Sequence, residues 1–209
     1  MKTYNLNSAE YIKSIFIDFT LITNPNVIIG NEIMYGTGRR LVDLILLNDK
    51  RITAVEIKSD SDNLKRIKEQ ITEYKKIFNF VVLIITRKHL ENILEITSKD
   101  IGIYLITEDF LIQLIRLPHL QKMIVKREIL YSINSRYLKN LGEPLTKSLH
   151  SDEIRKYFEK KKLTYLNTLL FFYLENKISS NFRLFILERG EKTHIEDLSI
   201  LSTSQNLIE

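Results

Sequence analysis

Two acidic residues interrupt strands that are otherwise aliphatic, and a lysine follows the second acid by two positions. Asp43 lies in the run Leu41–Leu47, and Glu56 and Lys58 lie in the run Ile52–Lys58. A buried carboxylate without a partner is costly, so acids at these positions need a reason. Carboxylate oxygens bind hard cations such as Mg²⁺, and a lysine ammonium stabilises negative charge. These residue types therefore favour metal-assisted hydrolysis of a phosphate ester.

The turn between the two runs decides whether the acids meet. If Asn48 pairs with Arg51 around an even-numbered turn, Asp43 lies opposite Glu56 on one face of the hairpin. Lys58 points to the same face, because side chains alternate along a strand. Two carboxylates so placed repel one another unless a cation lies between them. A three-residue loop would break this register, and an acid–lysine pair that satisfies itself inside a sheet is the alternative interpretation.

The elements that must position these residues follow an alternating pattern. Predicted strands cover residues 27–29, 41–47, 52–58, 80–86 and 101–106, and predicted helices cover 8–19, 60–78 and 88–96, with another from about residue 109. This order predicts an α/β fold of three layers around a mixed sheet, over residues 1–120. Residues 121–209 form a second, mostly helical unit in which the apolar run Leu163–Leu174 is expected to be buried.

The amino-acid composition excludes several classes of function. The chain of 209 residues has no cysteine, which excludes a disulfide framework, a thiolate zinc site and a cysteine nucleophile. No apolar run reaches the roughly 18 residues of a membrane span, so a soluble, cytoplasmic protein is expected. Net charge is +5, and residues 121–163 carry eleven Lys/Arg against five Asp/Glu. That stretch suits a polyanion, although a solvated helical surface has the same composition.

The spacing of the acids resembles a known motif. Asp43, twelve further residues and then Glu56-Ile57-Lys58 look like the PD-(D/E)xK motif of restriction-endonuclease-like nucleases, with Val42 in place of the usual proline. Gln70 and Tyr74 resemble the Gln-x-x-x-Tyr helix of the RecB-like branch, and residues four apart share a helix face. The segment is similar to small bacterial nucleases linked to mobile elements.

The resemblance implies a restriction-endonuclease-like core that hydrolyses DNA with Mg²⁺ or Mn²⁺, in a mobile-element or phage-defence context. RNA is a further candidate substrate, and a homodimer is a further expectation. The implied catalytic residues are Asp43, Glu56, Lys58 and Gln70. The alternative is a catalytically silent nuclease-fold module that binds nucleic acid or a partner protein.

A third metal ligand is expected upstream of the motif. Glu32 is the first choice, with Glu10 and Asp18 as rivals on the first predicted helix. For contacts to DNA the candidates are Arg39, Arg40 and Tyr74, and the two arginines are equally suited to salt bridges with surface acids. The aromatic residues of the apolar C-terminal run are predicted to be core residues rather than base-stacking platforms: Tyr165, Phe171, Phe172 and Tyr173.

Overall fold

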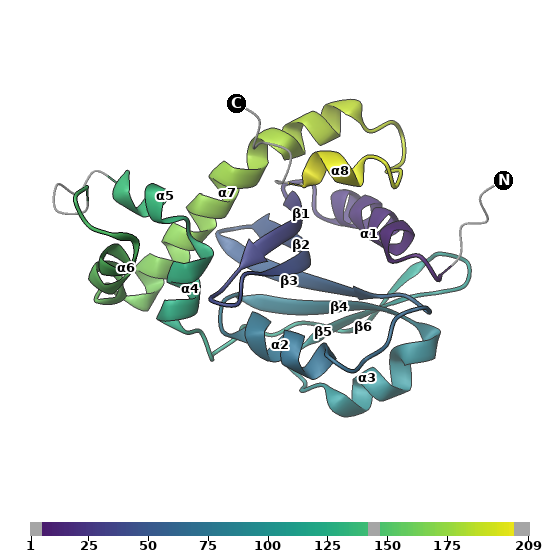
Figure 1. The fold of residues 1–209 in the computed structure, drawn as a ribbon. Coiled ribbons are helices and arrows are strands. Elements are labelled where there is room, and N and C mark those ends of the chain that lie inside the picture. Colours follow the sequence, from purple (N-terminus) through teal and green to yellow (C-terminus); the bar gives the residue numbers. More distant parts are fainter. Residues whose placement is uncertain (1–5, 142–146, 203–209) are drawn as a thin grey trace.

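A six-stranded mixed sheet forms the centre of the protein (Figure 1). The computed structural model describes residues 6–141 and 147–202. The strands lie in chain order across the sheet, and β3, β4 and β5 are parallel while the other neighbours are antiparallel. Their bounds are β1 Ile28–Tyr35, β2 Arg40–Asn48, β3 Arg51–Lys58, β4 Phe80–Thr86, β5 Gly102–Ile106 and β6 Ile112–Arg116. The predicted α/β class with a mixed sheet is confirmed.

Helices cover both faces of the sheet and make three layers (Figure 1). One face carries α1, Ala9–Thr23, which begins after its predicted N-cap Ser8. The opposite face carries α2, Ile67–Lys75, and α3, Leu90–Ile96, which follows the short 3-10 helix η1, Arg87–His89. Two buried apolar clusters fill the space between the layers, one on each side of the sheet.

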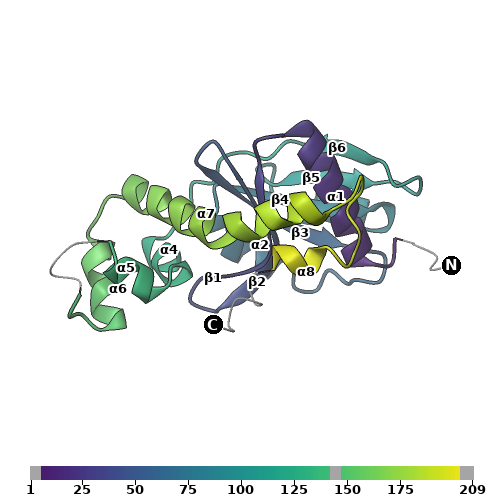
Figure 2. The same ribbon diagram turned by 90° about the horizontal axis from the view of Figure 1, so that it is seen from above.

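The C-terminal region is mostly helical, as predicted, and it shares its core with the sheet. The long helix α7 runs from α6 at one end of the molecule to α8 beside α1 (Figure 2). Ile178 of α7 packs so tightly on β1 that a Cβ atom on Gly30 would lie 3.1 Å from it. The helices are α4 Lys126–Ser132, α5 Ser135–Lys139, α6 Ser151–Glu159, α7 Leu163–Glu188 and α8 Leu198–Leu201. Within the described ranges, no helix is both long and apolar enough to cross a membrane.

Two predicted helices differ from the structure. The helix expected from Asp109 is wrong, because Phe110 adopts a positive φ of 62° and the chain turns back to pair as β6 with β5. The run after Phe110 is dense in apolar residues, so its sequence does not distinguish a helix from an edge strand. The helix expected from residue 60 begins only at Ile67, because Asp62 accepts the backbone N–H of Ser59 and closes a loop.

The hairpin of β2 and β3 has the predicted even-numbered turn. Asp49 and Lys50 both have positive φ, 47° and 57°, which is the geometry of a two-residue type I′ turn. Asn48 pairs with Arg51, and the ladder continues to the pair Leu44 and Val55. The predicted register is therefore confirmed as far as Leu44 and Val55, and when it is continued by one step it brings Asp43 opposite Glu56.

Candidate active site

The strands β2 and β3 separate at Asp43. The backbone ladder between them ends at Leu44 and Val55, one step before Asp43. Beyond that pair the Asp43 side chain links the two strands, because its Oδ2 accepts a hydrogen bond from the backbone N–H of Ile57 at 2.8 Å. A side chain thus replaces a backbone acceptor and joins the two strands beyond the end of their ladder.

The neighbouring strand β1 is irregular at the matching position. Its pairs with β2 flank the break, Asn31 with Leu44 on one side and Ile33 with Val42 on the other. Between them Glu32 has a φ of 53°, in the left-handed region that non-glycine residues rarely adopt. Backbone strain of this kind costs roughly 1–3 kcal/mol and clusters at functional sites.

Glu56 is the centre of the site. It is 3% exposed, and its two oxygens accept three side-chain hydrogen bonds. Oε1 accepts from Lys58 Nζ at 2.7 Å and from Gln70 Nε2 at 2.5 Å. Oε2 accepts from the hydroxyl of Tyr74. These three donors give the buried carboxylate of Glu56 the hydrogen-bond partners that it needs away from water.

Helix α2 delivers two of these donors. Gln70 and Tyr74 lie one turn apart on one face of the helix, as their spacing predicts, and both donate to Glu56 of β3. Tyr74 is fully buried, and its ring packs edge-on against Tyr35 and Phe78 with centroid separations of 5.3 and 5.9 Å. The aromatic cluster fixes the helix, and the helix fixes the amide and the hydroxyl on Glu56.

The site holds two acids whose charges oppose each other. Burial first, and then the charge of Glu56, raise the pKa of Asp43 from 3.8 to about 6. The hydrogen bond from Ile57 and the charges of Lys13 and Lys58 act in the opposite direction. Burial and the Glu56 charge also raise the pKa of Tyr74, so its hydroxyl stays protonated and donates. A cation between Asp43 and Glu56 would relieve their repulsion.

The loop after Lys58 is held from three sides. The backbone N–H of Asp60 donates to Leu6 O at 2.8 Å, and the Lys88 ammonium donates to Asp60 O. The buried His89 places Nε2 2.9 Å from the carbonyl oxygen of Ser59. These contacts connect the end of β3 to the start of α3, so Lys58 projects from a fixed backbone.

A second polar cluster was not predicted from the sequence. Lys13 of α1 is 6% exposed, and its Nζ donates to Asn31 Oδ1 at 2.8 Å. Asn31 Nδ2 in turn donates to Leu198 O at 3.1 Å and to Ser202 Oγ at 2.8 Å. The cluster joins α1, β1 and α8 directly beside the strained Glu32. Its only sequence signal is a lysine next to Ile12 on the apolar side of the first helix.

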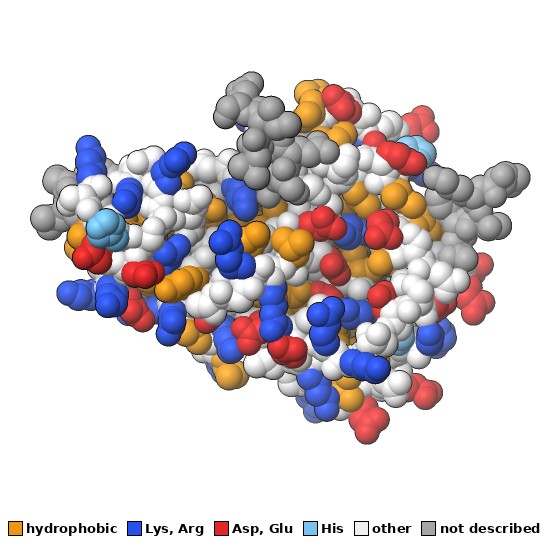
Figure 3. Space-filling view, in the orientation of Figure 1, with side chains coloured by type: hydrophobic (Ala, Val, Ile, Leu, Met, Phe, Trp, Pro, Cys, Tyr) orange, Lys and Arg blue, Asp and Glu red, His pale blue; other side chains and the backbone are white. Residues whose placement is uncertain are grey.

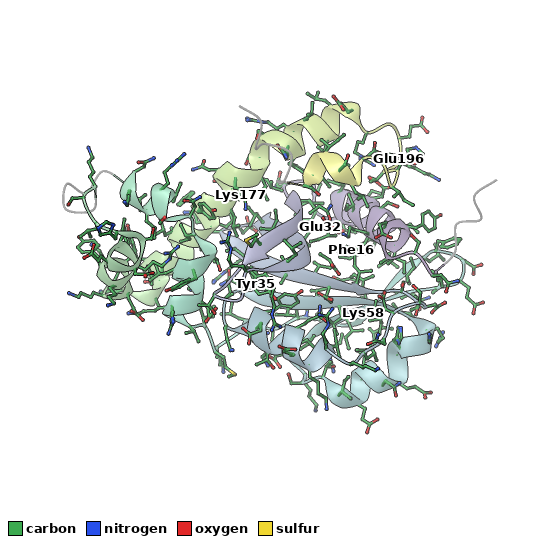
Figure 4. All side chains as sticks on the ribbon, in the orientation of Figure 1. Phe16, Glu32, Tyr35, Lys58, Lys177 and Glu196 are labelled. Atoms are coloured by element: carbon green, nitrogen blue, oxygen red, sulfur yellow. The ribbon has the colours of Figure 1, made fainter. Side chains whose placement is uncertain are left out.

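The three candidates for the upstream acid have different surroundings. Glu32 and Glu10 line a hollow of about 320 Å³ with Lys13, on the α1 side of the sheet. Figure 4 shows Glu32 on that side and Lys58 nearer α2. Asp18 accepts from Arg189 at 2.6 Å and from Thr193, which is a structural tie to the C-terminal region.

The expected set of three metal ligands does not come together. Across residues 6–141 and 147–202 there is no group of three or more His, Cys, Asp or Glu side chains that could hold a metal ion. Asp43 and Glu56 lie at the end of the β2–β3 ladder. Glu32 lines the hollow with Glu10 and Lys13, and its left-handed φ interrupts the pairing of β1 with β2.

The three residues expected to contact DNA also have different surroundings. Arg40 forms an exposed ion pair of 2.6 Å with Glu69, the alternative that its sequence left open. Arg39 is exposed, and its Nε lies 3.4 Å from Met34 Sδ. The prediction that Tyr74 contacts nucleic acid is wrong, because the residue is fully buried and its hydroxyl donates to Glu56.

Comparison with known proteins gives a family. A family model described as bacteriophage P4 protein cII matches residues 3–202. Protein cII of Enterobacteria phage P4 is 26% identical over 204 residues, covering 93% of this chain and 74% of that protein. A protein of unknown function from Silicibacter pomeroyi has a similar solved structure, with a TM-score of 0.43, 16% identity, and coverage of 63% of this chain and 83% of its own.

Proposed function

This chain belongs to the bacteriophage P4 protein cII family, and from its site geometry we propose that it is a metal-dependent nuclease that hydrolyses phosphodiester bonds of DNA. One observation carries the proposal. Asp43 and Glu56 follow the last pair of the β2–β3 ladder and lie close enough for the charge of Glu56 to act on Asp43, and the Lys58 ammonium lies 2.7 Å from Glu56. Two acids and a lysine so arranged suit a reaction in which negative charge develops on a phosphate.

The donor set fits a divalent cation. Asp43 and Glu56 supply hard oxygen ligands, and their mutual repulsion leaves the site short of positive charge. Mg²⁺ or Mn²⁺ held there would polarise the phosphate and activate water. Mg²⁺ usually keeps several waters, so two protein carboxylates are a sufficient anchor for it.

Each remaining residue has a role that follows from its contacts. Lys58 is the cation that can stabilise the developing charge, because its Nζ lies 2.7 Å from Glu56 and 12% of its side chain is exposed. Gln70 and Tyr74 position Glu56 by donating to different oxygens. Gln70 is only partly buried, so its amide is the one of the two that also lies within reach of a water or a phosphate oxygen.

The direct test is cleavage of plasmid and linear DNA by purified protein, with Mg²⁺ or Mn²⁺ and with EDTA. We expect metal-dependent cutting that falls at least about 100-fold in Lys58→Ala. Lys99→Ala is the matched control, because it removes an exposed lysine of α3's C-terminal loop and should leave cutting unchanged. The proposal fails if the wild-type protein cuts no better than Lys58→Ala with either metal on either substrate.

A silent nucleic-acid-binding module is the second candidate. It is favoured by the saturation of Glu56, whose two oxygens already accept from Lys58, Gln70 and Tyr74. The two candidates differ in what Asp43→Asn does. In a nuclease this variant abolishes metal-dependent cleavage, whereas in a silent module there is no cleavage to lose and DNA affinity is unchanged.

A further inference from the structure

The junction of α6 and α7 carries a basic surface outside the candidate active site. Residues 154–168 contain five Lys/Arg and one acid, Glu159. Figure 3 shows more Lys and Arg than Asp and Glu side chains over the end of the molecule formed by α5 and α6. The surface is hollowed by about 470 Å³, and the hollow is lined by Lys161, Lys162, Thr164, Tyr165 and Thr168.

An aromatic ring lies exposed in this hollow. Tyr165 was expected in the core, but it is 42% exposed. Its ring stacks on the fully buried Phe158, with centroids 6.5 Å apart and an interplanar angle of 10°. Phe158 therefore supports one face of the Tyr165 ring, and the exposed part is held in a fixed orientation. Phe172 is likewise 42% exposed, whereas Phe171 is buried as predicted.

Two of the positive charges around the ring, those of Lys160 and Lys162, are available to an anion. Lys160 and Lys162 are exposed, and within residues 6–141 and 147–202 neither forms an ion pair. Lys161 is ordered over the Tyr157 ring, with its Nζ 5.1 Å from the centroid. Cation–π contacts leave the charge in place, so this lysine still contributes to the local field.

We propose that the α6–α7 surface binds single-stranded DNA. Lys160 and Lys162 contact backbone phosphates, and an unpaired base stacks on Tyr165. A duplex cannot use the platform, because each of its bases is already stacked on both faces. The inference rests on the proposed function, since it assigns the surface that holds the strand outside the candidate active site of Asp43 and Glu56.

The electrostatic part is tested by the salt dependence of binding. A short fluorescein-labelled single strand is titrated in EDTA with the full-length protein at several salt concentrations. For the double variant Lys160→Ala/Lys162→Ala we expect the slope of log affinity against log salt to fall by about 1.4, because each lost phosphate contact removes about 0.7. The matched variant Lys99→Ala/Lys192→Ala removes the same charge from exposed sites elsewhere and should keep the slope.

The stacking part is tested at Tyr165. Tyr165→Leu keeps an apolar contact with Phe158 but removes the platform, so affinity for the single strand should fall about 5- to 150-fold. Tyr165→Phe keeps the ring and should keep the affinity. Binding of a duplex of the same sequence should be weaker and should respond to neither variant.

The inference is overturned if the two double variants lose affinity equally, if Tyr165→Leu binds as the wild type does, or if the duplex binds as tightly as the single strand. Its failure is separate from failure of the nuclease proposal, because EDTA removes cleavage from the measurement. A protein that binds single-stranded DNA at this surface but cuts no DNA would support this inference and contradict the nuclease proposal.

Discussion

The Asp43 carboxylate accepts the backbone N–H of Ile57 at 2.8 Å, so the acid of one strand is held by the residue that follows Glu56 in the next. The bond stabilises the Asp43 carboxylate next to Glu56, because it acts against the rise in the pKa of Asp43. Ile57 fixes Asp43, while Lys58, Gln70 and Tyr74 fix Glu56. Because the two acids have separate sets of donors, the contribution of each acid to stability and to metal binding can be tested with its own variant.

Asp43→Asn should stabilise the fold at neutral pH. Asp43 has a folded pKa of about 6 against 3.8 for an ordinary aspartate, so the folded state binds the proton more tightly. Stability from this group is present below pH 4 and is lost as the pH rises to 6. Asparagine stays neutral and can still accept from Ile57. We expect a gain of about 1–3 kcal/mol at pH 7 and almost none at pH 4, measured by urea unfolding. A variant less stable than wild type at pH 7 would contradict this.

Mg²⁺ should raise the melting temperature of the wild-type protein in a pH-dependent way. A ligand that binds only the folded state stabilises it. Protons compete with the metal for Asp43, so the shift should be full at pH 8 and should shrink as the pH falls through about 6. Asp43→Asn and Glu56→Gln should abolish the shift. Glu95→Gln, an exposed acid of α3, is the control that should retain it.

Tyr74→Phe should destabilise the protein by about 1.5–3 kcal/mol, which is the range for a hydrogen bond to a charged group. The ring still packs on Tyr35 and Phe78, but Glu56 Oε2 loses its donor in a buried site. The free energy of unfolding in urea measures the effect. Tyr165→Phe removes an exposed hydroxyl and serves as the control. Equal stabilities for the two variants would show that Tyr74 does not stabilise Glu56.

Asn31→Leu should lower the free energy of unfolding strongly when it is made alone, and much less when it is combined with Lys13→Met. The single change leaves the buried Lys13 ammonium without its hydrogen-bond partner, at a cost of about 3 kcal/mol or more. Removing both polar groups also removes that penalty, so the double variant should be more stable than Asn31→Leu. A double-mutant cycle in urea gives the coupling energy. Strict additivity of the two changes would mean that the pair does not interact.

The sequence by itself determined the features that follow from local periodicity. Side chains alternate along a strand, so an even-numbered turn between Asn48 and Arg51 was enough to bring Asp43 opposite Glu56. The helical repeat was enough to place Gln70 and Tyr74 on one face. The five predicted strands and the apolar helix from Leu163 follow from the same rule, because each buries a face that its own residues define.

The tertiary structure decided what depends on distant partners. The strand β6 exists because β5 offers it an edge, although its sequence is equally suited to a helix. Tyr165 is exposed because α7 turns that side away from the sheet. Glu32 adopts a left-handed φ and lines a hollow with Glu10 and Lys13, and Asn31 bonds to Ser202, 171 residues away. Such contacts have no period along the chain, since they arise only when separate elements pack, and for that reason the sequence pattern could not reveal them.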